Sequence, residues 1–301
     1  MKFIKHLWVL LYCILLCSFT VYVLLDTFVL TKAFSQETET PSAYDGEITE
    51  ETESPLAPVI TDTLYRDPNI LITITEHRYA DSNAYVADIV LSSAEYLKTA
   101  FAQNTYGRNI AEETSVIAAA NGAILAINGD FYGSQERGYV IRNGVLYRKT
   151  VSRDRQDLVI YEDGSFEVIM EKEISAEELL ESGACHVLSF GPVLVQNGKA
   201  DVPRNGLRGH ATQYNPRTAI GIIDDLHYVF ATVDGRTKDS RGMTAYELAM
   251  FMESLGVTTA YNLDGGGSAT IYFNGKVINE PTYNGKDIEE RKVSDIVYIG
   301  Y

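Results

Sequence analysis

Short apolar runs separated by turn dipeptides fill the chain from Ile70 onward. This alternation of runs and turns limits the possible folds of the chain more than any other feature. Asn-Gly or Asp-Gly stands between two strand-like runs at residues 143–144, 163–164 and 197–198. Such dipeptides between apolar runs are the sequence signal of a β-hairpin. Further strand-like runs, alternating or small and apolar, occupy residues 70–75, 85–91 and 115–126. The pattern predicts a strand-rich domain.

Helical periodicity is confined to a few segments. Residues 175–181 are short, polar and acidic, and residues 244–255 carry apolar side chains at the i, i+3, i+4, i+7 spacing of one helix face. Gly256 would end the second helix. With 46% hydrophobic residues in a chain of 301, a large core can form. We therefore predict an α+β fold in which strand-rich mixed sheets pack around few helices, in a single domain spanning residues 66–301.

The N-terminal segment has the composition of a membrane anchor. Lys2 and Lys5 precede an uncharged apolar run from Leu7 to Leu25, which is long enough to span a bilayer. Positive charge before the run and acid after it place the N-terminus in the cytoplasm. We predict a cytoplasmic segment at 1–6, a transmembrane signal anchor at 7–30 and an extracellular domain, which together make a single-pass protein of the cell membrane. A cleaved signal peptide is the alternative.

Residues 31–65 are predicted to form a disordered acidic stalk rich in Ser, Thr, Glu and Pro. This composition buries too little apolar surface to fold, and its like charges repel one another. The stalk contributes strongly to the net charge of −16 through Glu37, Glu39, Asp45, Glu47, Glu50, Glu51 and Glu53. No cluster of Lys or Arg suggests a nucleic-acid partner.

The cysteines exclude a disulfide framework. Cys13 and Cys17 lie within the apolar run, which leaves Cys185 alone in the domain. We interpret Cys185 as a small packed residue rather than a nucleophile, because its neighbour His186 is adjacent in sequence only.

Polar residues beside glycines follow several strand-like runs. The strongest case is Asp264-Gly265-Gly266-Gly267-Ser268, because three glycines build neither strand nor helix but allow close approach to a ligand. The other cases have ordinary alternatives. Asn128-Gly129 and Asp234-Gly235 are common turn dipeptides. Glu247 completes a capping box with Thr244, and Arg217 could form a surface ion pair.

Taken together and in order, these blocks resemble one known family. Asn215-Pro216-Arg217, Val233-Asp234-Gly235-Arg236, Ser240-Arg241-Gly242-Met243-Thr244 and the segment from Asn262 to Thr270 are similar to blocks of the phosphodiester glycosidase family. Upstream, the segments 126–132 and 190–192 also resemble the family. The resemblance covers roughly Ile70 to Tyr301 and points to a bacterial, exopolysaccharide-type member.

The resemblance implies cleavage of a sugar-1-phosphodiester of the GlcNAc-1-phosphate type. Carboxylates stabilise the oxocarbenium-like state of such a reaction, and an arginine can hold the departing phosphate. The expected catalytic residues are Asp264, with Glu247 or Asp234 as its acid/base partner. The expected substrate-binding residues are Asn128, Asp130, Arg217, Arg236, Asn262, Gly265, Gly266, Gly267 and Ser268. The glycines would offer amide donors.

Several alternatives stay open at this point. No cofactor is required, although Asp130, Asp234 and Asp264 could together hold a divalent cation. The expected partner is a phosphodiester-linked carbohydrate polymer, such as a cell-surface glycopolymer or an exopolysaccharide. The same cleft could serve a non-catalytic polysaccharide-binding or cell-wall-binding module. The sequence leaves the sugar, the anomer and the stereochemical course undecided.

Overall fold

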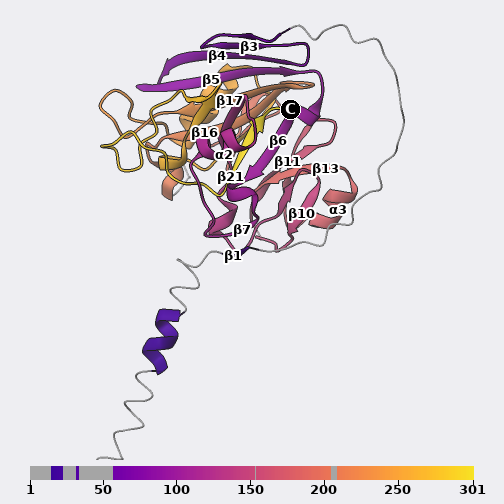
Figure 1. Ribbon diagram of the computed structural model, residues 1–301, viewed down its shortest axis with the longest axis vertical. Helices are drawn as coiled ribbons and strands as arrows, with labels where there is room; N and C mark the ends of the chain where they lie inside the picture. Colours follow the sequence, from indigo (N-terminus) through magenta and orange to yellow (C-terminus); the bar gives the residue numbers. More distant parts are fainter. Residues whose placement is uncertain (1–14, 23–31, 34–56, 153, 205–208) are drawn as a thin grey trace, which may run out of the picture.

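The computed structural model describes residues 15–22, 32–33, 57–152, 154–204 and 209–301 (Figure 1). Three sheets dominate this part of the chain. The predicted strand-rich α+β fold is confirmed, with one correction: the described strands pair antiparallel throughout rather than in mixed directions. Tight turns join neighbouring strands antiparallel, whereas parallel neighbours need long crossovers.

The largest sheet has nine strands in the order β15-β14-β18-β16-β17-β5-β4-β3-β2. They are β2 (Val59–Ile60), β3 (Leu64–Arg66), β4 (Ile70–Tyr79), β5 (Ser82–Leu91), β14 (Val193–Gln196), β15 (Lys199–Ala200), β16 (Arg217–Asp224), β17 (His227–Val233) and β18 (Thr259–Leu263). Figure 1 shows β3, β4 and β5 at the top of the molecule. The first five residues of β4 alternate between buried and half-buried, as a strand with one core face requires.

Two five-stranded sheets and one strand pair complete the strand content. One sheet, ordered β10-β9-β13-β11-β12, contains β9 (Val140–Arg142), β10 (Val145–Arg148), β11 (Gln156–Tyr161), β12 (Phe166–Met170) and β13 (Ala184–Leu188). The other, ordered β20-β19-β8-β21-β6, contains β6 (Leu97–Phe101), β8 (Leu125–Asn128), β19 (Ile271–Phe273), β20 (Lys276–Val277) and β21 (Asp295–Ile299). The short strand β1 (Lys32–Ala33) pairs with β7 (Gly107–Arg108).

Each sheet carries one helix against its own hydrophobic cluster. The helices are α2 (Thr114–Ala120), α3 (Ala176–Glu181) and α4 (Ala245–Ser254), and residues 15–22 are also helical. Short 3-10 helices lie at η1 (Ala94–Tyr96), η2 (Ala102–Asn104), η3 (Tyr132–Ser134), η4 (Gly209–Thr212) and η5 (Gly266–Ser268). The two predicted helices correspond to α3 and α4. Leu248 and Met252 of α4 pack with residues of β16 and β17, which places α4 on the nine-stranded sheet.

The main core brings all three sheets together. Its buried side chains include Ile72 and Ile89 from the nine-stranded sheet, Leu158 from β11 and Ile127 from β8. Each such side chain contributes about 1.5–3 kcal/mol when removed from water. This shared core fixes the sheets against one another, so residues at the strand ends keep defined relative positions.

At three segments the described structure differs from the expectation or does not reach it. The run 115–126 is not continuous strand, because its alanine-rich first half forms α2, in keeping with the high helix propensity of alanine. Strands β2 and β3 begin at Val59 and Leu64, so regular structure starts before the predicted boundary at residue 66. Most of the predicted stalk, residues 34–56, lies outside the described residues.

The predicted membrane anchor is described only at residues 15–22. Among the helices that the structure describes, none has both the length and the apolar character needed to cross a bilayer. The remainder of the predicted span, residues 7–14 and 23–30, lies outside the described part of the chain.

A buried carboxyl pair makes the stability of the domain dependent on pH. Asp157 on β11 is fully buried, and burial followed by the negative charge of the neighbouring Glu171 raises the pKa of Asp157 well above its ordinary value. The folded protein therefore retains a proton that the unfolded chain releases near pH ~4. Since the folded state binds more protons above that pH, stability should fall as the pH rises from about 4 toward neutrality.

Urea unfolding at pH 5 and pH 8 measures this slope. Asp157→Asn removes the titrating group while keeping its shape, so the variant should lose less stability between the two pH values than the wild type does. Equal losses in both proteins would show that other groups cause the dependence.

Candidate functional site

Antiparallel register brings the predicted site blocks to one edge of the sheets. Arg217 pairs with Val233, and Thr218 pairs with Leu263, so the start of β16 lies beside the ends of β17 and β18. In the neighbouring sheet Asn128, at the end of β8, pairs with Ile296 near the start of β21. Between the two sheets, the Asp264 N–H donates to the Gly129 carbonyl at 3.2 Å, which places the loops after β18 and β8 side by side.

The three glycines approach the protein's own backbone closely. A Cβ on Gly265 would lie 2.6 Å from the Pro216 carbonyl oxygen, and one on Gly267 would lie 3.0 Å from the Cα of Tyr283. Gly266 has a φ of 62°, and its N–H donates to the same Pro216 carbonyl at 2.9 Å. The expected close approach is thus real, but its partners are neighbouring loops. The Gly265 amide likewise donates within the protein, to Asp264 Oδ1 at 2.9 Å.

The carboxylate of Asp264 is held by a hydroxyl and a guanidinium. Its Oδ2 accepts hydrogen bonds from Ser268 Oγ at 2.8 Å and from Arg291 Nη2 at 2.6 Å. Arg291 also donates to Ser268 Oγ, through Nε at 2.9 Å and Nη2 at 2.6 Å. Asp264, Ser268 and Arg291 therefore form one hydrogen-bonded group that joins the glycine loop to the segment before β21.

This group lies on the wall of a cavity of about 330 Å³. The volume falls within the range of small-molecule sites. Among the described residues that line it, Asp264 is the one carboxylate, and Arg291 and Lys292 supply positive charge. The wall consists of Asn109, Ile110, Ala111, Gly129, Phe131, Ser134, Asp264, Ser268, Arg291, Lys292, Val293 and Ser294.

Opposing effects act on the ionisation of Asp264. Burial raises the pKa of this carboxyl, and the charge of Arg291 together with the hydrogen bond from Ser268 lowers it, with a net upward shift. The side chain is 13% exposed at the cavity. Asp264 thus combines access to a ligand with a pKa above the ordinary aspartate value.

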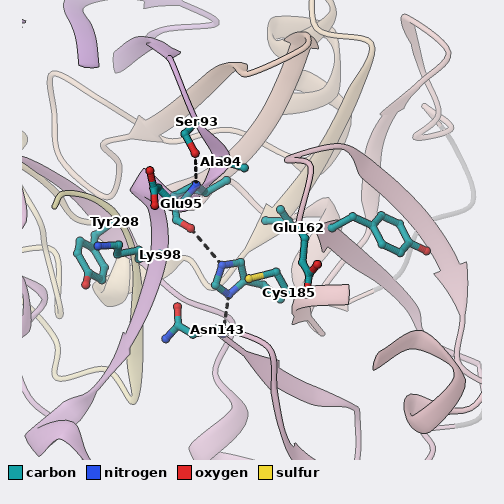
Figure 2. A pocket seen from close by; sticks show the side chains of 12 residues that line it. Ser93, Ala94, Glu95, Lys98, Asn143, Glu162, Cys185 and Tyr298 are labelled. Atoms are coloured by element: carbon teal, nitrogen blue, oxygen red, sulfur yellow. Dashed lines mark hydrogen bonds between the residues drawn. The ribbon is translucent and has the colours of Figure 1, made fainter. Parts of the chain in front are cut away.

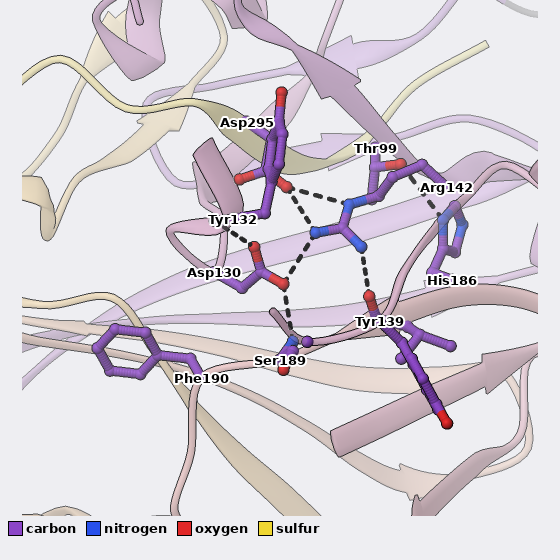
Figure 3. A network of polar contacts seen from close by, with 12 residues as sticks. Thr99, Asp130, Tyr132, Tyr139, Arg142, His186, Ser189, Phe190 and Asp295 are labelled. Atoms are coloured by element: carbon purple, nitrogen blue, oxygen red, sulfur yellow. Dashed lines mark hydrogen bonds and ion pairs between the residues drawn. The ribbon is translucent and has the colours of Figure 1, made fainter. Parts of the chain in front are cut away.

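Asp130 belongs to a buried ion network with Arg142 and Asp295 (Figure 3). Arg142 Nη2 lies 2.9 Å from Asp130 Oδ2 and 2.8 Å from Asp295 Oδ2, and all three side chains are almost fully buried. Asp130 also accepts from the N–H groups of Tyr132 at 3.1 Å and Ser189 at 2.7 Å. The predicted substrate contact of Asp130 is replaced by a structural role.

The two predicted asparagines are also buried within the fold. Asn128 Nδ2 donates to the Asp264 carbonyl at 2.7 Å, and Asn128 Oδ1 accepts from Thr218 Oγ1 at 2.7 Å. Asn262 Nδ2 donates to the Gly191 carbonyl at 2.7 Å. Their exposed fractions of 0% and 1% leave no surface for a sugar, so we assign them to positioning the loops.

Asp234 occupies a separate buried environment. Its carboxylate accepts from Asn279 Nδ2 at 2.9 Å and from the Glu280 N–H at 3.1 Å. Burial raises the pKa of Asp234 to about 6. Asp234 does not belong to the cavity wall around Asp264, so the structure gives no support to the predicted partnership of these two carboxylates.

Glu247 caps α4, as its alternative interpretation predicts. Its Oε2 accepts from the Thr244 N–H at 2.9 Å, the Thr244 hydroxyl caps the Glu247 N–H, and Oε1 pairs with Arg241 at 2.8 Å. Both carboxylate oxygens are therefore occupied away from the cavity. The structure therefore gives no support to the acid/base assignment of Glu247.

Paired substitutions separate capping from catalysis. Thr244→Ala and Glu247→Ala should each lower the free energy of unfolding by about 1 kcal/mol, because each breaks the capping box. Activity per folded molecule should remain close to wild type in both. A loss of activity in Glu247→Ala that Thr244→Ala does not share would restore the catalytic assignment. Chemical unfolding and initial rates measure the two effects.

The predicted arginines bind backbone and loop atoms. Arg217 is 6% exposed and donates to the carbonyls of Met243, His210 and Gln213 at 2.8–2.9 Å. Burial lowers its pKa to about 10. The exposed Arg236 donates to the Tyr283 carbonyl at 2.9 Å, and its guanidinium lies over Gly266. Arg236 thus lies beside the glycine loop, whereas Arg217 binds the backbone of the segment before β16.

The predicted cation site is not assembled. Asp130, Asp234 and Asp264 each belong to a different hydrogen-bonded group, as described above. Across residues 15–22, 32–33, 57–152, 154–204 and 209–301, no group of three or more His, Cys, Asp or Glu side chains could hold a metal ion.

A second cavity, of about 400 Å³, surrounds Cys185 (Figure 2). Burial raises the pKa of the Cys185 thiol, which disfavours the nucleophilic thiolate. The neighbouring His186 is nearly fully buried, with Nδ1 accepting from the Asn143 N–H at 3.1 Å and Nε2 lying 3.2 Å from the Leu97 carbonyl. His186 is thus held by backbone atoms, and the raised pKa of the thiol disfavours Cys185 as a nucleophile.

Arg291 and Phe131 line the cavity around Asp264 but were not among the predicted site residues. Arg291 lies in the charged run Glu289-Glu290-Arg291-Lys292, which has the composition of an ordinary solvated surface. Phe131 directly follows the Asn-Gly-Asp block, where an aromatic residue has no distinctive local signal. Only the pairing of β8 with β21 brings these two segments to one cavity.

Comparison with known proteins identifies the relatives of the chain. Residues 121–300 match the family model described as phosphodiester glycosidase. N-acetylglucosamine-1-phosphodiester alpha-N-acetylglucosaminidase is 27% identical over 212 residues in Mus musculus and 29% identical over 208 residues in Homo sapiens. Each match covers 64% of this chain and 40% of the relative. The SPbeta prophage-derived uncharacterized protein YomE of Bacillus subtilis (strain 168) is 32% identical over 201 residues, 65% of this chain and 31% of that protein.

The chain spans between three and four tenths of the length of these curated relatives. Among solved structures, the zebrafish catalytic domain of the same glucosaminidase, auto-inhibited by its pro-peptide, superposes with a TM-score of 0.62 at 21% identity. That match covers 90% of this chain and 88% of the zebrafish chain. A hypothetical protein from Synechocystis gives a TM-score of 0.56 at 12% identity, over 77% of this chain and 62% of that chain. These two likenesses show the fold.

Proposed function

Because the chain belongs to the phosphodiester glycosidase family, we propose that it cleaves the bond between the anomeric carbon of a sugar and a phosphodiester, with GlcNAc-1-phosphate linkages as its substrate class. The observation that carries this proposal is the placement of Asp264 beside Arg291 on one cavity wall. The animal relatives, whose name specifies N-acetylglucosamine-1-phosphodiester, support the choice of sugar.

The Asp264 carboxylate suits the sugar side of the bond that breaks, and the Arg291 guanidinium suits the phosphate side. Asp264 faces the anomeric carbon, where it stabilises the developing positive charge as nucleophile or as the base for a water molecule. Arg291 binds the phosphate, because its side chain is 34% exposed and its Nη1 forms no hydrogen bond with the described residues. A planar guanidinium recognises phosphate oxygens well.

The single carboxylate of the cavity is sufficient for this leaving group. When the bond between the anomeric carbon and the phosphate oxygen breaks, the electron pair stays on the phosphate. A phosphate monoester has a second pKa of about 6, so it departs near neutral pH without a proton donor. Ordinary glycosidases need a second carboxylic acid for that proton. Loss of Glu247 and Asp234 from the predicted machinery is therefore compatible with catalysis.

The assay uses the purified chain and a GlcNAc-1-phosphodiester such as the methyl ester of GlcNAc-1-phosphate. Appearance of free GlcNAc together with the phosphate monoester supports the proposal. Binding of the substrate without turnover would instead favour a non-catalytic polysaccharide-binding module. The anomeric configuration of the first product, followed by NMR, separates retention from inversion.

We also propose that the enzyme is anchored in the cell membrane and acts outside the cell on surface glycopolymers or exopolysaccharide. The apolar run from Leu7 to Leu25, preceded by Lys2 and Lys5, supports this location, as does the acidic segment after it. Membrane fractionation and protease treatment of intact cells test it. Recovery of the full-length chain in the soluble cytoplasmic fraction would contradict it.

A further inference from the structure

Phe131 adopts a backbone conformation that costs the fold energy. Its φ is 78°, in the left-handed region that bulky residues avoid and that glycine adopts without strain. The side chain is nevertheless 38% exposed. A strained residue with an exposed aromatic ring is not explained by burial in a core, and such outliers point to functional sites.

The residues around Phe131 hold it in this conformation. On one side, Gly129 donates to the Asp295 carbonyl at 2.8 Å and accepts from the Asp264 N–H at 3.2 Å. On the other, the Tyr132 N–H donates to the Asp130 carboxylate at 3.1 Å, and Arg142 fixes that carboxylate at 2.9 Å. Figure 3 shows Arg142 between Asp130 and Asp295. Backbone hydrogen bonds of Gly129 therefore hold one flank of Phe131, and the buried ion network holds the other.

Tyr132, the next residue in the chain, is packed in the core, whereas the ring of Phe131 is not. Tyr132 is 2% exposed, and its ring lies 5.2 Å from those of Phe101 and Tyr106. Phe131 has one ring neighbour, Phe190, at 6.5 Å in an edge-on arrangement among the described residues. Instead, Phe131 shares the wall of the 330 Å³ cavity with Asp264 and Arg291.

We propose that the Phe131 ring is the platform for the sugar in this cavity and selects a pyranose ring over an acyclic alcohol. One face of a pyranose carries C–H groups, which pack against the negative face of an aromatic ring. Asp264 would then face the anomeric carbon while Arg291 binds the phosphate. This assignment rests on the proposed function and deepens it by naming the residue that recognises the sugar.

Three substitutions at this position separate sugar recognition from folding. Phe131→Gly removes both ring and strain, Phe131→Ala removes the ring and keeps the strain, and Phe131→Tyr keeps the ring. We expect KM for the GlcNAc-1-phosphodiester to rise about tenfold in the Gly and Ala variants, with kcat within about threefold of wild type. The Tyr variant should restore KM. The melting temperature of Phe131→Gly should equal or exceed that of Phe131→Ala, because glycine tolerates this φ.

Two inhibitors show whether the Phe131 ring contacts the sugar or the phosphate of the ligand. The inhibition constant of GlcNAc-1-phosphate should rise about tenfold in Phe131→Gly, whereas that of inorganic phosphate, which lacks a sugar, should stay unchanged. Equal effects on both inhibitors, an unchanged KM, or a Phe131→Gly variant less stable than Phe131→Ala would overturn the platform role and leave the hydrolytic function intact.

Calorimetric binding of GlcNAc-1-phosphate distinguishes failure of this inference from failure of the proposed function. If the wild type binds the ligand without hydrolysing phosphodiesters, and Phe131→Gly loses that binding, the platform stands and the hydrolytic proposal falls. If the wild type neither binds nor hydrolyses, both fall.

Discussion

Asp264→Asn is expected to lower kcat/KM for a GlcNAc-1-phosphodiester by roughly 10³-fold. Asparagine keeps the shape of the side chain and an oxygen that can accept from Ser268, but it can neither attack an anomeric carbon nor accept a proton from water. The pairing partner Arg291 is 34% exposed, so water can solvate it once the carboxylate is gone. The variant should therefore fold, and initial rates with a thermal melt measure both consequences.

The pH profile of the wild type gives a second readout of the same residue. Asp264 must be ionised to act, and its pKa is raised by burial. The rate should therefore fall on acidification at a pH above the ordinary aspartate value of about 3.9. Asp157→Asn, a buried carboxyl outside the cavity, is the matched control and should keep the wild-type rate.

Full activity of a folded Asp264→Asn variant would remove this carboxylate from the mechanism. Asp234→Asn tests the other predicted catalytic aspartate. Asp234 follows the neighbouring strand β17 but does not line the cavity. A large loss of activity in folded Asp234→Asn alone would move the catalytic assignment to that residue.

Arg142→Met should produce the largest loss of stability, about 3–5 kcal/mol. Arg142 is fully buried and lies within 3 Å of both Asp130 and Asp295. Without the guanidinium, two carboxylates remain in a low-dielectric interior with no cation to balance them. Burial and the charge of Asp130 already raise the pKa of Asp295, although Arg142 opposes that shift. Urea unfolding at constant pH measures the loss.

Two controls test whether charge causes the loss. Lys149→Met removes one partner of the exposed ion pair with Glu177 and should change the free energy of unfolding by less than about 1 kcal/mol. The double variant Arg142→Met with Asp295→Asn should be less destabilised than the sum of the two single changes. Additive effects would show that Arg142 acts through packing of its side chain alone.

The sequence predicted several local features of the fold. At 143–144 and 197–198 both turn residues have positive φ, as Asn-Gly hairpins require. The periodicity of residues 244–255 predicted α4, and the Thr244–Glu247 spacing predicted its capping box. Each of these signals involves residues within one or two turns of each other, so it does not depend on the rest of the fold.

The candidate site could be predicted only in part from the sequence, because it depends on both local motifs and distant contacts. The sequence drew attention to Asp264, the glycines and Ser268 as a cluster without a local structural explanation, and the structure places Asp264 and Ser268 on one cavity wall. It could not separate the roles of Glu247 and Asp130, because a carboxylate that caps a helix or balances a buried arginine looks the same in sequence as one that faces a ligand. Their partners decide the role, and Asp130 meets Arg142 only through contacts between strand ends.

The sequence by itself determined the strand-rich fold, the turns, the capped helix and the position of the loop that carries Asp264. Only the tertiary structure decided that Arg291, 27 residues further along the chain, pairs with Asp264, and that Phe131 shares their cavity. The physical reason is that backbone propensity acts over a few residues. Sheet register and core packing set which distant side chains meet, and these depend on the whole chain at once.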